Sequence, residues 1–164
     1  MRVAIGNTGF FATIDDEDAE RVGHYKCWEL VRTRRAGVFY ACARPKSGGV
    51  RGAMVLMHRL VVNYAGPLDV DHINGDGLDN RRANLRVATR SQNLANGRKR
   101  KSASGFKGVC ADSDGRHWKG QITVGGRNKY LGYFSSAREA AMAYDRAARA
   151  AFGEFAVTNF AEVN

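Results

Sequence analysis

A polar segment in the middle of the chain, VDHINGDGLDNRRANLR over residues 70–86, constrains the fold more than any other stretch. Its Asn-Gly and Asp-Gly pairs favour a tight loop, and the apolar residues Val70 and Leu85 near its ends favour short flanking strands. A helix is expected to follow, with Thr89 or Ser91 as its N-cap. The sequence therefore predicts a compact β-loop-β-helix unit.

The first fifty residues predict a β-rich scaffold that leads into this unit, because their apolar residues occur in short runs between turn residues. Asp15 is expected to cap a short acidic helix. The expected elements are a hairpin over 2–14, a helix over 16–23, strands over 28–35, 37–45 and 52–57, and a short helix that ends before Gly66.

Residues 106–164 have a different pattern, which predicts a three-stranded antiparallel sheet packed on one α-helix. The strands are expected in FKGV, HWKGQITV and NKYLGYF, with good turn sequences between them. The helix is expected in SSAREAAMAYDRAARAAFG, where Ser136 and Glu139 have capping-box spacing and Gly153 provides the stop. The basic stretch before this region, residues 97–105, is expected to be a linker.

The charge of the chain indicates its partner. There are 26 Lys and Arg residues against 16 Asp and Glu, a net charge of +10, and this excess favours a polyanion, with double-stranded DNA as the leading candidate. A membrane is a weaker alternative, since the sequence has no basic helix with a bulky apolar face. Cys27, Cys42 and Cys110 form no CxxC pair, so no structural zinc is expected.

Four residues of the predicted β-loop-β-helix unit have the chemistry that phosphodiester hydrolysis requires. Neutral His72 could take a proton from an attacking water, and Asn84 could orient its imidazole. Asp71 and Asn93 offer a carboxylate and an amide oxygen, which suit a hard cation such as Mg²⁺ or Mn²⁺. Neighbouring strand residues face opposite ways, so Asp71 and His72 share a site only if the strand ends there, as Gly75 and Gly77 favour.

The stretch VDHINGDGLDNRRANLRVATRSQNLAN, with MHRLVV before it, resembles the HNH endonucleases, also called ββα-metal or His-Me finger nucleases, and among them the phage and intron-encoded homing type. The resemblance implies that His72 is the general base and that Asn84 holds it. It also implies that Asp71 and Asn93 are metal ligands, that Asn80 braces the loop, and that cleavage leaves 5′-phosphate and 3′-hydroxyl ends.

Alternation along residues 117–124 places Trp118 and other apolar residues on the helix side of the predicted sheet, and polar residues on the other side. The region from GFKGV to TNF resembles the apetala-two/ethylene-response-factor DNA-binding domain, in its KGV start, YLGYF strand and AAMAYDRAA helix. Cys110 and Thr123 stand where that family commonly has arginine, so its target sequence cannot be carried over. The residues expected to contact DNA are Lys107, Arg116, His117, Lys119, Gln121, Thr123, Arg127, Tyr130, Arg98, Lys99, Arg100 and Lys101.

The sequence thus predicts an α+β protein with a β-rich segment over 1–50, an HNH nuclease core over 51–96, a basic linker over 97–105 and a DNA-binding domain over 106–164. His58 is expected to be a structural histidine near the site, with a direct catalytic part as the other possibility. Scaffolding and DNA contact both fit the first segment.

The predicted function is a metal-dependent DNA endonuclease of homing type, active as a monomer or a DNA-induced dimer and needing no small-molecule cofactor. The alternative is a DNA-binding regulator whose HNH unit is inactive. An RNA-binding protein has less support, because the sequence contains no recognisable RNA-binding motif. The expected location is the cytoplasm of a bacterial or phage-infected cell, on the nucleoid.

Overall fold

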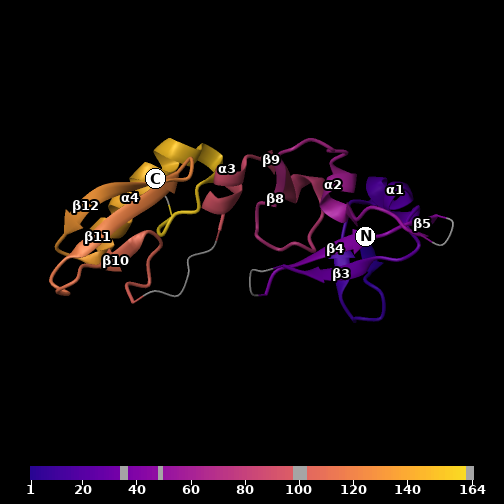
Figure 1. Cartoon of the computed structure of the whole chain (residues 1–164), viewed down its shortest axis with the longest axis horizontal. Coiled ribbons are helices and arrows are strands. Elements are labelled where there is room, and N and C mark those ends of the chain that lie inside the picture. The colour runs from indigo at the N-terminus through magenta and orange to yellow at the C-terminus, as the bar shows by residue number, and fades with distance from the viewer. Residues whose placement is uncertain (34–36, 48–49, 98–102, 162–164) are drawn as a thin grey trace. The chain divides into compact units, whose positions relative to one another are not determined.

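The computed structural model describes residues 1–33, 37–47, 50–97 and 103–161, and it divides the chain into two compact units, Met1–Ala88 and Thr89–Asn164 (Figure 1). Each unit combines short antiparallel sheets with helices, so the chain has the α+β architecture that the sequence predicted. Arg98, Lys99, Arg100 and Lys101, which were expected to contact DNA, lie outside the described residues. In the described part, no helix has the length and apolar character needed to cross a bilayer.

The first unit is built from short strands around two small helices. Its elements are β1 (Arg2–Ala4), β2 (Phe11–Thr13), the 3-10 turn η1 (Asp16–Asp18), α1 (Ala19–Gly23), β3 (Glu29–Arg32), β4 (Phe39–Ala43), β5 (Lys46–Ser47), β6 (Val50–Arg51), β7 (Val55–Leu56), α2 (Met57–Val61), β8 (Asp69–His72), η2 (Arg82–Asn84) and β9 (Leu85–Ala88). The antiparallel pairs are β1–β2, β5–β6 and β8–β9, and β3, β4 and β7 form a three-stranded sheet. The predicted hairpin, acidic helix and strand pair around the polar loop are therefore confirmed.

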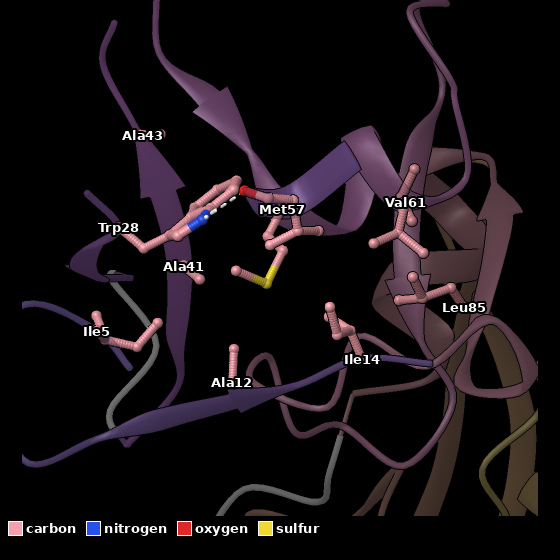
Figure 2. Close-up of a cluster of buried hydrophobic side chains, with 11 residues drawn as sticks. Ile5, Ala12, Ile14, Trp28, Ala41, Ala43, Met57, Val61 and Leu85 are labelled. Atoms are coloured by element: carbon pink, nitrogen blue, oxygen red, sulfur yellow. Dashed lines mark hydrogen bonds between the residues drawn. The ribbon is translucent and has the colours of Figure 1, made fainter. Parts of the chain in front are cut away.

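One hydrophobic core joins the first fifty residues to the segment that follows them (Figure 2). Met57 of α2 is fully buried among side chains of β2, β4 and the loop that holds Trp28, and the Trp28 indole donates a hydrogen bond to the Val22 carbonyl at 3.3 Å. The buried members are Ile5, Ala12, Ile14, Val22, Trp28, Ala41, Ala43, Met57, Val61, Val70 and Leu85. Because β8 and β9 contribute Val70 and Leu85, the N-terminal segment provides the packing partner for the strands on either side of the polar loop.

Backbone hydrogen bonds attach the polar loop to strand β2. The Thr13 N–H donates to the Leu78 carbonyl at 2.8 Å, and the Asn80 N–H donates to the Thr13 carbonyl at 2.7 Å. Asp15 stands at the N-cap position of η1, but its side chain makes no cap hydrogen bond there; it accepts from the Arg82 N–H at 2.7 Å. A tertiary contact has thus replaced the local cap that the sequence predicted.

A second long-range tie joins η1 to η2. The Arg82 guanidinium donates two hydrogen bonds to the Asp18 carboxylate, at 2.9 Å from Nε and 2.6 Å from Nη2. Asp18 is only 1% exposed, whereas Glu17, which pairs with the same guanidinium at 2.8 Å, lies at the surface. The bidentate pair compensates for the cost of burying a carboxylate, and it holds the turn that precedes β9 against the N-terminal segment.

The second unit consists of α3 (Arg90–Ala95), β10 (Val109–Ala111), β11 (Trp118–Val124), β12 (Arg127–Phe134), α4 (Ala137–Phe152) and η3 (Gly153–Phe155). The strands form one antiparallel sheet in the order β10-β11-β12, and α4 packs on one face of it (Figure 1). Ser136 and Glu139 form the predicted capping box at the start of α4, and Gly153, with a φ of +53°, follows its last residue.

The face alternation predicted for β11 is confirmed. Ile122 and Val124 pack with Tyr144 of α4, and Trp118 packs near Ala140 and Ala141. Gly108 approaches Tyr144 so closely that a Cβ would lie 1.9 Å from the ring. The alanines of α4 and this glycine therefore allow the helix to lie close to the sheet.

Helix α3 belongs to this second unit. Thr89 and Gln92 form a capping box at its start, so Thr89 is the N-cap of the two candidates. Ala95 is buried with Ile122 and Tyr144, and the Lys107 ammonium donates to the Ala95 carbonyl. Lys107 was expected to contact DNA, and the structure gives its ammonium this structural partner at the C-terminal end of a helix.

Replacing Asp18 by Asn should destabilise the first unit by about 2 kcal/mol, since the charge-assisted pair with Arg82 would lose its buried carboxylate. Glu17→Gln removes the exposed partner of the same arginine and should change stability by less than about 0.5 kcal/mol. Urea denaturation of the two variants measures the difference. Equal stabilities would show that the buried pair does not hold the two turns together.

Candidate active site

Strand β8 ends at His72, and Asp71 is the residue before it. The Gly75 N–H donates to the His72 carbonyl at 2.8 Å, and Gly75 has a φ of +73°, a conformation that favours glycine, so the chain turns immediately after the histidine. Both side chains are buried, Asp71 at 5% and His72 at 4% exposure. The strand end that the two glycines predicted is therefore present.

The Asn80 side chain defines which nitrogen of the His72 ring carries the proton. Asn80 Nδ2 donates to the Leu78 carbonyl at 3.1 Å, so its Oδ1 is the atom that faces His72 Nε2 at 3.3 Å. An amide oxygen only accepts, so this network assigns the proton to Nε2 and leaves Nδ1 as the basic nitrogen of the neutral ring. Asn80 thus occupies the place beside the imidazole that the sequence assigned to Asn84.

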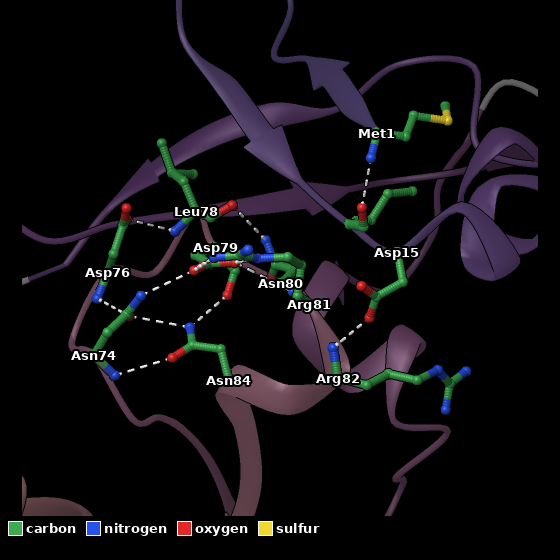
Figure 3. A network of polar contacts seen from close by, with 11 residues as sticks. Met1, Asp15, Asn74, Asp76, Leu78, Asp79, Asn80, Arg81, Arg82 and Asn84 are labelled. Atoms are coloured by element: carbon green, nitrogen blue, oxygen red, sulfur yellow. Dashed lines mark hydrogen bonds and ion pairs between the residues drawn. The ribbon is translucent and has the colours of Figure 1, made fainter.

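Asn84 instead organises the loop (Figure 3). Its Nδ2 donates to the Asp79 carbonyl at 2.7 Å and to Asn74 Oδ1 at 3.0 Å, and its Oδ1 accepts from the Asn74 N–H at 3.0 Å. The sequence predicted the reverse assignment: Asn84 was expected to orient the imidazole, and the resemblance to the HNH endonucleases implied that Asn80 braces the loop. In the structure, Asn84 closes the loop and Asn80 contacts His72.

Asp79 is the charged centre of the loop. Arg81 donates to it from Nε at 2.8 Å and from Nη2 at 2.7 Å, and Asn74 Nδ2 donates at 2.9 Å (Figure 3). The hydrogen bonds from Arg81 hold the pKa of the Asp79 carboxyl below its usual range, although partial burial acts in the opposite direction. Asp79 therefore remains ionised, and its carboxylate oxygens accept hydrogen bonds from Arg81 and Asn74.

The donor set at the strand end suits a hard divalent cation. Asp71 is paired across the strands with Arg86, whose Nε donates to Oδ2 at 3.1 Å, and a carboxylate has further lone pairs beyond this contact. Asn93, the second expected ligand, lies on α3 in the other unit, so its place beside Asp71 stays a prediction. Within the described residues, no three His, Cys, Asp or Glu side chains converge.

His58, on α2, contacts the ring of His72. The two ring centroids are 5.1 Å apart in an edge-to-face arrangement, and the Tyr40 ring lies close to both. Burial, followed by the neighbouring His72, lowers the pKa of His58 to about 3. Burial also lowers the pKa of His72, while the Asn80 hydrogen bond and the charge of Asp71 act in the opposite direction. Both imidazoles are therefore neutral at neutral pH, as a general base must be before it acts.

A second candidate surface is the face of the β10–β12 sheet that lies opposite α4. Its predicted members Lys119, Gln121 and Thr123 are alternate residues of β11. Gln121 is paired with the fourth predicted member, Tyr130 of β12, and Lys119 is paired with Tyr133. Tyr130 and Tyr133 are 56% and 58% exposed, and their ring centroids are 5.5 Å apart. Tyr133 was not expected at this face, because the register shift at Gly120/Gln121 that aligns it with Tyr130 leaves no mark in the sequence.

The remaining residues predicted to contact DNA lie at the ends of the strands of this sheet. Arg116 and His117 lie in the turn before β11, where both backbone N–H groups donate to Asp112 Oδ1, and their side chains are exposed. Arg127 begins β12 and is also exposed. The structure thus places all of these residues at the surface of the second unit, whereas the Lys107 ammonium bonds a backbone carbonyl.

Comparison with known proteins agrees with the geometry of the first site. Residues 55–95 match the family model described as HNH endonuclease, a range that contains Asp71, His72, Asn84 and Asn93. The match indicates an HNH endonuclease domain over residues 55–95. It is also 32% identical over 105 residues to an uncharacterized HNH endonuclease of Acanthamoeba polyphaga mimivirus, over 63% of this chain and 54% of the relative. The chain thus spans about half the length of that relative.

The free energy of unfolding should fall as the pH is lowered from 7 to 5. The folded His58 has a pKa of about 3 and the unfolded one about 6.5, so between these values the unfolded state binds more protons and acid favours unfolding. His58 alone should cost about 2 kcal/mol over this interval. Urea denaturation at several pH values should give a smaller slope for His58→Leu than for the wild type. Equal slopes would contradict the burial of a neutral imidazole.

Proposed function

We propose that the protein is a metal-dependent DNA endonuclease of homing type, in which His72 activates the water that hydrolyses a phosphodiester bond. The observation that carries the proposal is the buried, neutral His72 whose Nε2 is held by Asn80 within an HNH endonuclease domain. Because Nε2 carries the proton, Nδ1 is the nitrogen that accepts the proton of the attacking water.

The hydrolysis then proceeds by direct displacement at phosphorus. The water oxygen bonds to phosphorus as its proton moves to His72 Nδ1, and the bond between phosphorus and the 3′-oxygen breaks. The leaving oxygen takes a proton from solvent, which gives 5′-phosphate and 3′-hydroxyl ends. Asn80 accepts a hydrogen bond from Nε2–H throughout, so it stabilises the imidazolium that forms when Nδ1 is protonated.

Asp71 and Asn93 would hold Mg²⁺ or a similar divalent cation. When bound, the cation supplies positive charge where negative charge builds up on the phosphate and on the leaving oxygen. Arg86, which pairs with Asp71 at 3.1 Å, orients the carboxylate at the end of β8. The protein's contribution is thus a fixed carboxylate next to a fixed base.

The C-terminal sheet would position the nuclease on double-stranded DNA, as the resemblance to the apetala-two/ethylene-response-factor domain implies. A sheet face with lysine, amide and aromatic side chains offers contacts to phosphates and to base edges in the major groove. Lys119 lies over the Tyr130 ring with its ammonium 5.8 Å from the centroid, so both present one continuous face. A regulator with an inactive HNH domain would share this surface and would differ only in cleavage.

Supercoiled plasmid incubated with the protein and Mg²⁺ should be nicked or linearised, and His72→Ala should lower the rate at least about a hundredfold because the general base is lost. DNA binding should stay close to normal, as a filter-binding assay would measure. His24→Ala, which removes an exposed histidine of the same unit, should cleave like the wild type. Absence of cleavage by the wild type with every divalent metal would favour the regulator instead.

Lys119→Ala should weaken DNA binding and lower the slope of log K against log salt by about 1, since one phosphate contact would be lost. Lys129→Ala is the matched control, because Lys129 is paired with Ile122, a residue of the helix-facing side. Fluorescence anisotropy over a salt series measures both slopes. If the two variants bind equally well, this sheet face does not contact DNA.

A further inference from the structure

The His72 ring lies against two other rings from distant parts of the first unit. It stacks on Tyr40 of β4, with the centroids 5.5 Å apart and the planes at 17°. His58 of α2 lies edge-to-face with it at 5.1 Å and 86°, and also contacts Tyr40 at 5.0 Å and 69°. Each of the three rings therefore contacts the other two.

These contacts restrict a motion that the hydrogen bond to Asn80 leaves possible. A histidine ring has a broad rotation about its second side-chain torsion, and one hydrogen bond at Nε2 still allows the ring to tilt about that contact. A stacked partner on the face and a second ring at a right angle limit that tilt. The direction of Nδ1, opposite the held nitrogen, then follows from the packing.

The loop fixes Tyr40 from another side. A Cβ at Gly77 would lie 2.4 Å from Cδ1 of Tyr40 and 2.2 Å from the Phe39 carbonyl oxygen, so the Gly77 backbone rests directly on this part of β4. Only a glycine leaves that space, and the same loop carries Asn80. Tyr40 is thus in contact with both the loop and the ring of His72.

Burying the His58 imidazole costs free energy that an apolar side chain packed at the same place would not cost. Its side chain is 4% exposed, and Nδ1 has no hydrogen-bond partner among the described residues, a condition that an aliphatic side chain of similar size would avoid. A neutral ring at this place adds no charge that would oppose the protonation of His72. At this position His58 therefore supplies an uncharged aromatic ring that packs edge-to-face against the His72 ring.

We propose that Tyr40 and His58 are positioning residues that hold the His72 imidazole in the orientation for proton transfer. This proposal rests on the nuclease function proposed above. Neither residue touches the reacting atoms; both act through the ring of His72. Removing either ring should slow the chemical step and leave DNA affinity unchanged, because misalignment of a general base reduces its efficiency without removing it.

The test compares single-turnover cleavage at saturating DNA and Mg²⁺. Tyr40→Leu should be slower than the wild type by about tenfold or more, while Tyr40→Phe, which keeps the ring, should stay within about threefold. Tyr25→Leu is the matched control, because Tyr25 is a partly buried tyrosine of the same core that packs on Trp28. It should retain the wild-type rate. Equal rates for Tyr40→Leu and Tyr25→Leu would overturn the proposal.

A second readout needs no cleavage. Long-range ¹H–¹⁵N NMR of the folded protein should show one His72 tautomer, with the proton on Nε2, in the wild type and in Tyr40→Phe. Tyr40→Leu and His58→Leu should show a mixture of tautomers, because a ring that tilts freely loses its Nε2 contact with Asn80 part of the time. Either variant suffices if the other does not fold. A single tautomer in both would contradict positioning. If the wild type shows one tautomer but does not cleave DNA, and the two leucine variants show mixed tautomers, the nuclease function is refuted and the positioning role is kept.

Discussion

The hydrogen bonds between Thr13 and the polar loop are the constraint on which the site depends. Two backbone contacts, at 2.8 Å to Leu78 and 2.7 Å from Asn80, attach the loop to strand β2, which is more than fifty residues earlier in the chain. Asn80 can face His72 only because its own backbone is held in this way. Loops of this length are usually mobile, so an external strand supplies the rigidity that a catalytic side chain needs.

Burial gives this site its chemistry. His72 is the last residue of the short strand β8, which packs on a core that the N-terminal segment completes. The low exposure of the His72 side chain favours the neutral ring. The N-terminal fifty residues thus supply the packing that supports the site, and contact of the same residues with DNA stays a prediction. Their core residues and the Asp18–Arg82 pair hold both ends of the polar loop.

Helix α3 is part of the HNH match by sequence and part of the second unit by packing. By its match to the HNH family, the HNH segment extends to residue 95, yet α3 packs with the C-terminal sheet and α4 through Ala95 and the Lys107 ammonium. The expected metal ligand Asn93 is therefore carried by a helix whose stability depends on the second unit. Hydrophobic packing, rather than the boundary of the family match, determines to which unit a short helix belongs.

The sequence by itself determined the local features of this protein. The capping box at Ser136, the strand end at His72 and the alternation along β11 each depend on residues a few positions apart, so spacing predicts them. Only the tertiary structure decided that Asn80 rather than Asn84 contacts the imidazole, and that Tyr40 lies on its face. Those contacts join residues from separate strands, and their geometry is set by packing that no local pattern records.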